Sequence, residues 1–129
     1  MIALHHVQVS CPRGGEDDAR RFYAETLHLT EVEKPPALRA RGGAWFRAYD
    51  ALGAVSAELH VGVEEPFVAA RRAHPALVVE SLEQVAADLR GAGYEVDLSE
   101  HETFPGHLRL HTRDGVGNRV ELLQRSPES

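Results

Sequence analysis

The chain has 129 residues, of which 43% are hydrophobic and 26% are charged, a composition typical of a globular protein and not of a disordered one. Its formal net charge of -6 argues against non-specific binding to nucleic acid, because an acidic surface repels the phosphate backbone. We see no signal peptide and no run near the ~18 apolar residues of a membrane span, and the single cysteine, Cys11, fits a reducing compartment, so we expect a cytoplasmic protein.

The first half of the chain predicts a strand, a helix and three further strands. The helix is indicated by apolar residues at helical spacing and by acidic residues in its first turn, which suit the helix dipole. Proline and glycine residues interrupt the pattern between the elements. The predicted ranges are 3–9 for the first strand, 16–27 for the helix, and 29–34, 43–49 and 55–63 for the later strands.

The second half predicts the same order of elements. Residues 64–72 form a linker or a helical turn, and a strand follows over 74–79. Ser81 is a candidate N-cap for a helix over 82–92, because serine favours that position. Three short strands complete this half, near 94–98, 107–113 and 119–124, and Asp114-Gly115 with Gly117-Asn118 marks the last turn.

The order of strand, helix and three strands therefore occurs twice, over about 3–63 and 74–124. Each half opens with a histidine at the head of a strand, His6 or His74, and closes with a glutamate before a leucine, Glu58 or Glu121. A repeated unit usually consists of two copies of one supersecondary piece that bury a face against each other. We predict a single α+β domain over residues 1–129, made of two βαβββ modules.

Alternation along the strands separates an apolar face from a polar one. In 55–63, for example, Glu58 and His60 oppose Leu59 and Val61. The polar faces are rich in histidine and arginine, so we expect them to line a concave cup, although a solvent-exposed sheet would also have a polar face. By the same alternation His5 should point to the apolar side and be structural.

Four residues form the predicted metal site: His6, Glu58, His74 and Glu121. Divalent Zn, Ni, Fe, Co or Mn accepts imidazole nitrogen and carboxylate oxygen, and two histidines with two carboxylates leave an octahedral ion two open positions. We expect all four side chains on the polar side of their strands, in the middle of the sheet. His60 shares a face with Glu58 and could replace it as a ligand.

Other side chains on the same faces are candidates for substrate binding. Arg47 and Arg109 would favour an anionic substrate, and Trp45 and Tyr49 could pack on the apolar part of the cup. An equally good interpretation is that these are ordinary salt-bridged or half-exposed strand residues. The complete predicted set is Gln8, Trp45, Arg47, Tyr49, His60, Arg109 and His111.

The chain resembles the glyoxalase / bleomycin resistance / dioxygenase (vicinal oxygen chelate) superfamily from end to end. The motifs that carry the likeness are Leu4–Val9 with Ala19–Leu29 at the start, Ala73–Val79 in the middle and Arg113–Glu121 at the end. His28 stands where the family usually has glycine, and Gly115 where it usually has proline. The resemblance implies paired βαβββ modules in a cup-shaped mixed sheet, and a homodimer.

The resemblance also implies ligands and an activity. His6, His74 and Glu121 match the ligands shared by fosfomycin-resistance transferases and ring-cleaving dioxygenases, and Glu58 matches the extra carboxylate of glyoxalase I, where it is also the catalytic base. We therefore expect a metal-dependent enzyme whose small substrate chelates the ion through two oxygens, most like a glyoxalase I-type lyase or isomerase, with Glu58 or Glu121 moving the proton. The alternative is a metal-free protein that sequesters an antibiotic.

Overall fold

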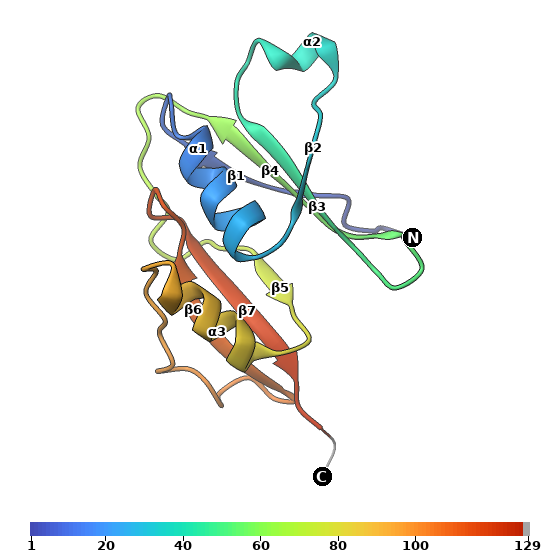
Figure 1. Ribbon diagram of the computed structural model, residues 1–129, viewed down its shortest axis with the longest axis vertical. Coiled ribbons are helices and arrows are strands. Elements are labelled where there is room, and N and C mark those ends of the chain that lie inside the picture. Colours follow the sequence, from blue (N-terminus) through green and yellow to red (C-terminus); the bar gives the residue numbers. More distant parts are fainter. Residues whose placement is uncertain (128–129) are drawn as a thin grey trace. The chain divides into compact units, whose positions relative to one another are not determined.

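The computed structural model describes residues 1–127, with helices and strands mixed in an α+β arrangement (Figure 1). The chain divides into two compact units, one over Met1–Ala69 and one from Ala70 onward. The division falls within the segment that was predicted to link the two modules. Within the described residues, no helix is both long and apolar enough to cross a membrane.

The first unit is a four-stranded sheet with the helical segment α1–η1 on one face, and α2 lies in the connection between β2 and β3 (Figure 1). Strand β1 lies at one edge and runs parallel to β4, and the other neighbours are antiparallel, in the order β1-β4-β3-β2. The helical segment begins as α-helix and continues with the wider π-helical turn. The elements are β1 Val7–Cys11, α1 Glu16–Ala19, η1 Arg20–Thr26, β2 Thr30–Val32, α2 Pro36–Arg39, β3 Ala44–Tyr49 and β4 Val55–Val63.

The core of this unit lies between the helical segment and the apolar face of the sheet. Phe22 and Tyr23 are fully buried, and the Tyr23 ring lies 5.6 Å from that of Phe46, between centroids. Leu59 and Val61 present the apolar face of β4 that alternation predicted. Because this face is covered by the helix, the opposite face of β3 and β4 remains for the polar side chains.

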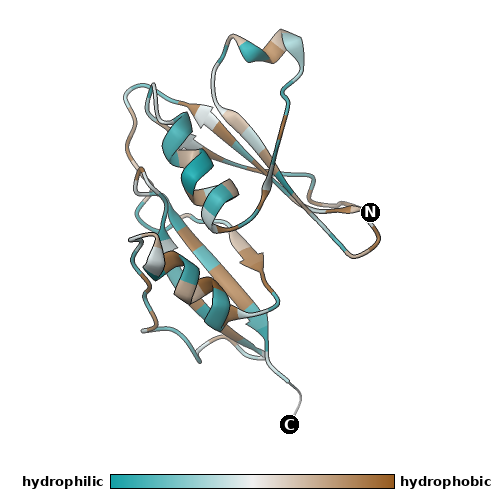
Figure 2. Ribbon diagram, viewed as in Figure 1, coloured by the Kyte–Doolittle hydropathy of each residue, from teal (hydrophilic) through white to brown (hydrophobic). Residues whose placement is uncertain are grey.

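The second unit repeats the plan with three strands, in the order β5-β7-β6. Strand β5 is at an edge and parallel to β7, as β1 is to β4. Helix α3 buries Leu82, Ala86 and Leu89, and the facing strands bury Leu110 and Val120. Figure 2 shows bands of hydrophobic and hydrophilic residues along this sheet. The elements are β5 Ala76–Val78, α3 Leu82–Gly91, β6 His107–Arg113 and β7 Arg119–Arg125.

Most predicted elements are confirmed, two predictions are wrong, and one short helix was not predicted. The first strand begins at Val7 and not at residue 3, so residues 1–6 precede the sheet. The strand near 94–98 is absent: only Asp97 pairs with His111, and the Asp97 carboxylate then accepts a hydrogen bond from the Ser99 N–H and turns the chain. Helix α2 was not predicted; its proline occupies a first-turn position that lacks an internal N–H partner anyway.

The residue after the first helical segment is His28, where the family usually has glycine. It has φ +65°, the left-handed conformation that glycine adopts without cost. The position after the first helix therefore keeps the backbone of a glycine turn although a histidine occupies it.

Ser81 caps α3 as predicted, because its hydroxyl accepts a hydrogen bond from the Gln84 N–H at 3.2 Å. We expect Ser81→Ala to lower the free energy of unfolding by about 1 kcal/mol, since an N–H in the first turn loses its partner. Urea denaturation of the two proteins measures this difference. Ser81→Asp, which can also accept the bond, is the matched control, and equal stability of the alanine variant and the wild type would contradict the assigned cap.

Candidate metal centre

Four carboxylate and imidazole side chains on the strands are buried, two in each sheet. Glu58 is 9% exposed and His60 is 6% exposed; His111 and Glu121 are each 4% exposed. A solvated sheet face would leave such groups accessible. Carboxylates and imidazoles at this depth require polar partners, because burial without them is unfavourable.

In the first unit the partners gather around Glu58. Arg47 stands opposite it in the β3–β4 pairing, and the Arg47 Nε donates to Glu58 Oε1 at 2.5 Å. The His60 Nε2 lies 2.8 Å from the other carboxylate oxygen, Oε2. Both oxygens of Glu58 are therefore engaged by residues of its own sheet.

A stack of three rings extends from this carboxylate. The His60 ring lies against Trp45, with centroids 4.0 Å apart and planes 4° from parallel, and against His6 on its other side at 4.1 Å. His6 itself is exposed and lies just before β1, not in the middle of the sheet as predicted. Stacking on His60 is what orients this predicted ligand.

His5 does not have the structural role expected of it. It is exposed, its Nδ1 lies 2.9 Å from His6 Nδ1, and the same atom is 3.9 Å from Glu58 Oε2. The prediction is wrong because strand alternation does not apply before Val7, where the chain has no regular structure. The adjacent pair of histidines was the signal that could have identified it as a candidate ligand.

In the second unit Glu121 occupies the central position. The His74 Nε2 lies 2.8 Å from Glu121 Oε1, and the His111 Nε2 lies 3.3 Å from the same oxygen. Arg109 Nη1 approaches the other oxygen, Oε2, at 3.4 Å. His74 lies just before β5, so, like His6, it is at the beginning of an edge strand and not in the middle of the sheet.

Each unit therefore contains two imidazoles and a carboxylate that could hold a cation, with donor atoms within 4.8 Å of one another. The groups are His5, His6 and Glu58, and His74, His111 and Glu121. Two of the four predicted ligands lie in each group. His111 had been predicted as a substrate residue; its position directly opposite Glu121 on the neighbouring strand is the signal that marks it as a further donor.

The protonation of these groups suits a metal site. Burial raises the pKa of Glu58, but hydrogen bonds from His60 and Arg47 outweigh it, so the net pKa is lowered. Glu121 behaves alike: burial raises its pKa, and His74 and Arg109 lower it further than burial raises it. Burial is the main cause that lowers the pKa of His60 and of His111. Ionised glutamates and neutral imidazoles are the forms that bind a divalent cation.

The predicted substrate residues surround these groups unevenly. Trp45 forms a wall of the ring stack, whereas Tyr49 is 45% exposed. The Gln8 amide lies over Gly62, where an added Cβ would come within 2.6 Å of it. Arg109 is tied to the 100–103 loop as well as to Glu121, through Glu100 O and the Thr103 hydroxyl.

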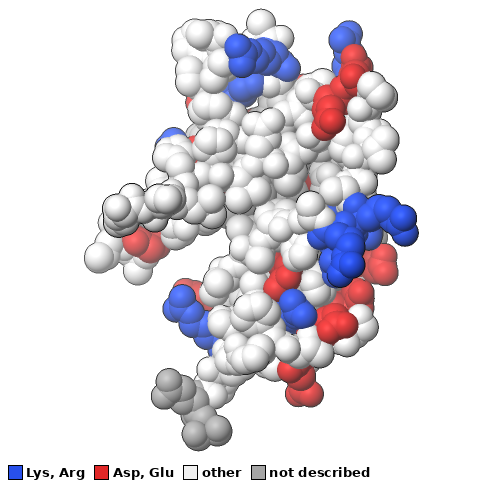
Figure 3. All heavy atoms as spheres, turned by 180° about the vertical axis from the view of Figure 1, so that it is seen from behind, with Lys and Arg blue, Asp and Glu red and all other residues white. Residues whose placement is uncertain are grey.

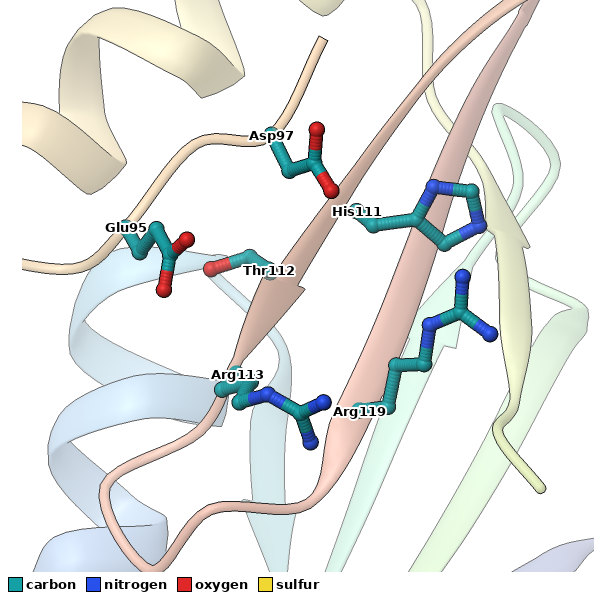
Figure 4. A pocket seen from close by; sticks show the side chains of 6 residues that line it. All are labelled: Glu95, Asp97, His111, Thr112, Arg113 and Arg119. Atoms are coloured by element: carbon teal, nitrogen blue, oxygen red, sulfur yellow. The ribbon is translucent and has the colours of Figure 1, made fainter. Parts of the chain in front are cut away.

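An open surface hollow lies beside the second group. It has a volume of about 110 Å³ and borders β6, and Figure 4 shows acidic and basic side chains on opposite parts of its wall. Its lining residues are Glu95, Asp97, His111, Thr112, Arg113 and Arg119. On the face seen in Figure 3, lysine and arginine side chains are interspersed with aspartate and glutamate.

The lowered pKa of Glu121 predicts a specific acid sensitivity. Its stabilising contribution is fully present above the usual glutamate value of 4.5 and is lost as the pH falls through the lower, folded-state pKa. We expect Glu121→Gln to be less stable than the wild type at neutral pH and to lose less stability on acidification. Urea denaturation between neutral pH and about pH 3 measures this, with the exposed Glu102→Gln as control; parallel pH profiles for wild type and Glu121→Gln would contradict the assignment.

Comparisons with known proteins agree with the fold. The family model of the glyoxalase/bleomycin resistance protein/dioxygenase superfamily matches residues 3–122. A glyoxalase family protein of Bacillus anthracis is 36% identical, with a TM-score of 0.86 and coverage of 98% of this chain and 97% of that one. A search among curated proteins found no match.

Two more distant structures share the fold. The antibiotic-binding protein TnmS3 of Streptomyces sp. CB03234 is 23% identical (TM-score 0.67), and the alignment covers 98% of this chain and all of that one. The fosfomycin resistance protein FosX of Listeria monocytogenes is 11% identical (TM-score 0.71), with 98% and 95% covered. By its sequence and its fold, this chain belongs to the glyoxalase/bleomycin resistance protein/dioxygenase superfamily.

Proposed function

We propose that the chain is a metal-dependent enzyme that acts on a small substrate with two neighbouring oxygens, most like a glyoxalase I-type lyase or isomerase. The observation that carries this proposal is the presence, in each unit, of a buried glutamate with two histidines whose donor atoms lie within 4.8 Å. Ionised carboxylate and neutral imidazole together fit Zn, Ni, Fe, Co or Mn.

The proposed ligands are His6 and Glu58 from one unit and His74 and Glu121 from the other. Strands β1 and β5 each lie at the edge of their own sheet; β1 begins directly after His6, and β5 begins two residues after His74. We propose that the two halves of the ligand set meet at one ion, within one chain or across a homodimer.

Different residues of the chain would have different roles in such a reaction. A bound cation would supply a Lewis acid with open positions for the substrate oxygens. Glu58 or Glu121 accepts the proton from carbon and returns it, since both are held ionised. Arg47 and His60 fix the Glu58 carboxylate, and Trp45 offers an apolar surface beside it.

Metal content is the direct test. We expect wild-type protein purified without a tag and reloaded with Zn²⁺ to retain stoichiometric metal after gel filtration, and His6→Ala and Glu121→Ala to retain much less. Elemental analysis measures this, with His107→Ala, a histidine outside both donor groups, as control. Equal metal content in all the proteins would remove the enzyme as proposed.

A second candidate function is sequestration of an antibiotic without metal, favoured by the structural likeness to an antibiotic-binding protein. Under this function, metal-free protein would bind a drug such as bleomycin with an affinity that neither added Zn²⁺ nor Glu121→Ala changes. Calorimetric titration separates the two functions. Tight, metal-independent binding would favour sequestration, and its absence would leave the enzyme. Whether the protein is an enzyme or a binding protein, we propose that it is a cytoplasmic homodimer.

A further inference from the structure

We propose that His111 is a metal ligand, and that His74, His111 and Glu121, all from the second unit, supply three donors to the cation. The inference rests on the metal dependence proposed above but not on how the two units pair. It adds to the ligand set a residue that the family resemblance does not supply.

The first argument is the convergence of donor atoms. His74 Nε2 and His111 Nε2 approach one carboxylate oxygen, Glu121 Oε1, at 2.8 and 3.3 Å. Ligands that bind one ion at about 2.0–2.2 Å lie roughly 3 Å from each other. Arg109 approaches the other oxygen, Oε2, at 3.4 Å, so the oxygen that faces the histidines remains for a cation.

The second argument is the tautomer of His74. Its Nδ1 lies 2.6 Å from the carbonyl oxygen of Arg72, which can only accept, so Nδ1 carries a proton. Its Nε2 faces Glu121 Oε1 at 2.8 Å, so a proton or a metal cation stands between these two atoms. A backbone carbonyl on the far nitrogen is the usual support of a metal-bound histidine.

The third argument concerns His111 itself. It is 4% exposed, and its Nδ1 has no hydrogen-bond partner among the described residues. Strand pairing places it directly opposite Glu121, so its Nε2 is held toward the carboxylate by the sheet. Nε2 is therefore the His111 atom that faces the other donors, and a neutral imidazole with a proton on Nδ1 keeps the Nε2 lone pair for a cation.

By the same criteria, the donor group of the first unit is expected to bind a cation more weakly. Both oxygens of Glu58 already accept hydrogen bonds from Arg47 and His60, and its two other candidate donors, His5 and His6, are exposed. We therefore expect the second unit to dominate affinity. Loss of His6 should weaken binding, whereas loss of His111 should nearly abolish it.

The experiment is a titration of the metal-free full-length protein with Co²⁺, followed by visible absorption. Loss of a residue that merely supports a ligand costs 10–100-fold in affinity, so we expect His111→Phe to weaken Co²⁺ binding by more than about 100-fold. His107→Phe, on the same strand but outside the cluster, is the matched control and should bind as the wild type does. His74→Ala and His6→Ala complete the series.

The outcomes are distinguishable. Wild-type affinity in His111→Phe, with loss in His74→Ala, would overturn the role of His111 and leave the metal enzyme intact. No Co²⁺ binding by the wild type would remove the metal-dependent function and this site with it. Binding that survives His6→Ala and Glu58→Ala but not His111→Phe would support the three-donor site and reject the four-residue set.

A second variant keeps the test decisive if circular dichroism shows that His111→Phe does not fold. His111→Cys replaces the imidazole with a thiolate, which also binds Co²⁺. A thiolate bound to Co²⁺ gives an intense near-ultraviolet band that no imidazole or carboxylate ligand produces. We expect this band in His111→Cys and not in the wild type, whose one cysteine, Cys11, is buried in the first unit. Its absence would overturn the proposal.

Discussion

A buried glutamate at the centre of each sheet is the constraint on which the rest of the site depends. A carboxylate at this depth is tolerated only with charged or hydrogen-bonding partners, and antiparallel pairing supplies one directly opposite: Arg47 for Glu58 and His111 for Glu121. The apolar residues between them on the same strands anchor the helices on the other face. Because side chains alternate between the two faces of a strand, the same strands supply the apolar core on one face and the buried polar group on the other.

The two units use the same plan for different purposes. In the repeat, Glu58 corresponds to Glu121, and two residues further along the strand His60 corresponds to Leu123. The residue paired with His60 is Trp45, and the residue paired with Leu123 is Arg109. The first unit thus places stacked rings as well as the Arg47 guanidinium beside its carboxylate, whereas the second places the Arg109 guanidinium there.

The sequence alone predicted the features that depend on short-range periodicity, namely the bounds of long strands and the face on which each side chain lies. Strands β4 and β6 have the predicted bounds, and alternation placed His60 and Glu58 on one face because each strand continues without a break there. Residues 3–6 and most of 94–98 were wrongly assigned to strands, because strand propensity does not show whether a neighbouring strand is present to pair with them. The role of His111 required the register of β6 against β7, which is a long-range property.

The donor groups also bear on which glutamate moves the proton. An octahedral ion that bound the four predicted ligands and His111 would keep too few open positions for a substrate that chelates through two oxygens. At least one protein donor would then have to remain off the ion. Glu58 is the best candidate, because Arg47 and His60 already engage both of its oxygens, whereas Glu121 Oε1 faces two histidines. Under the proposed function, Glu58 would then be the base, because it would lie beside the ion and not on it.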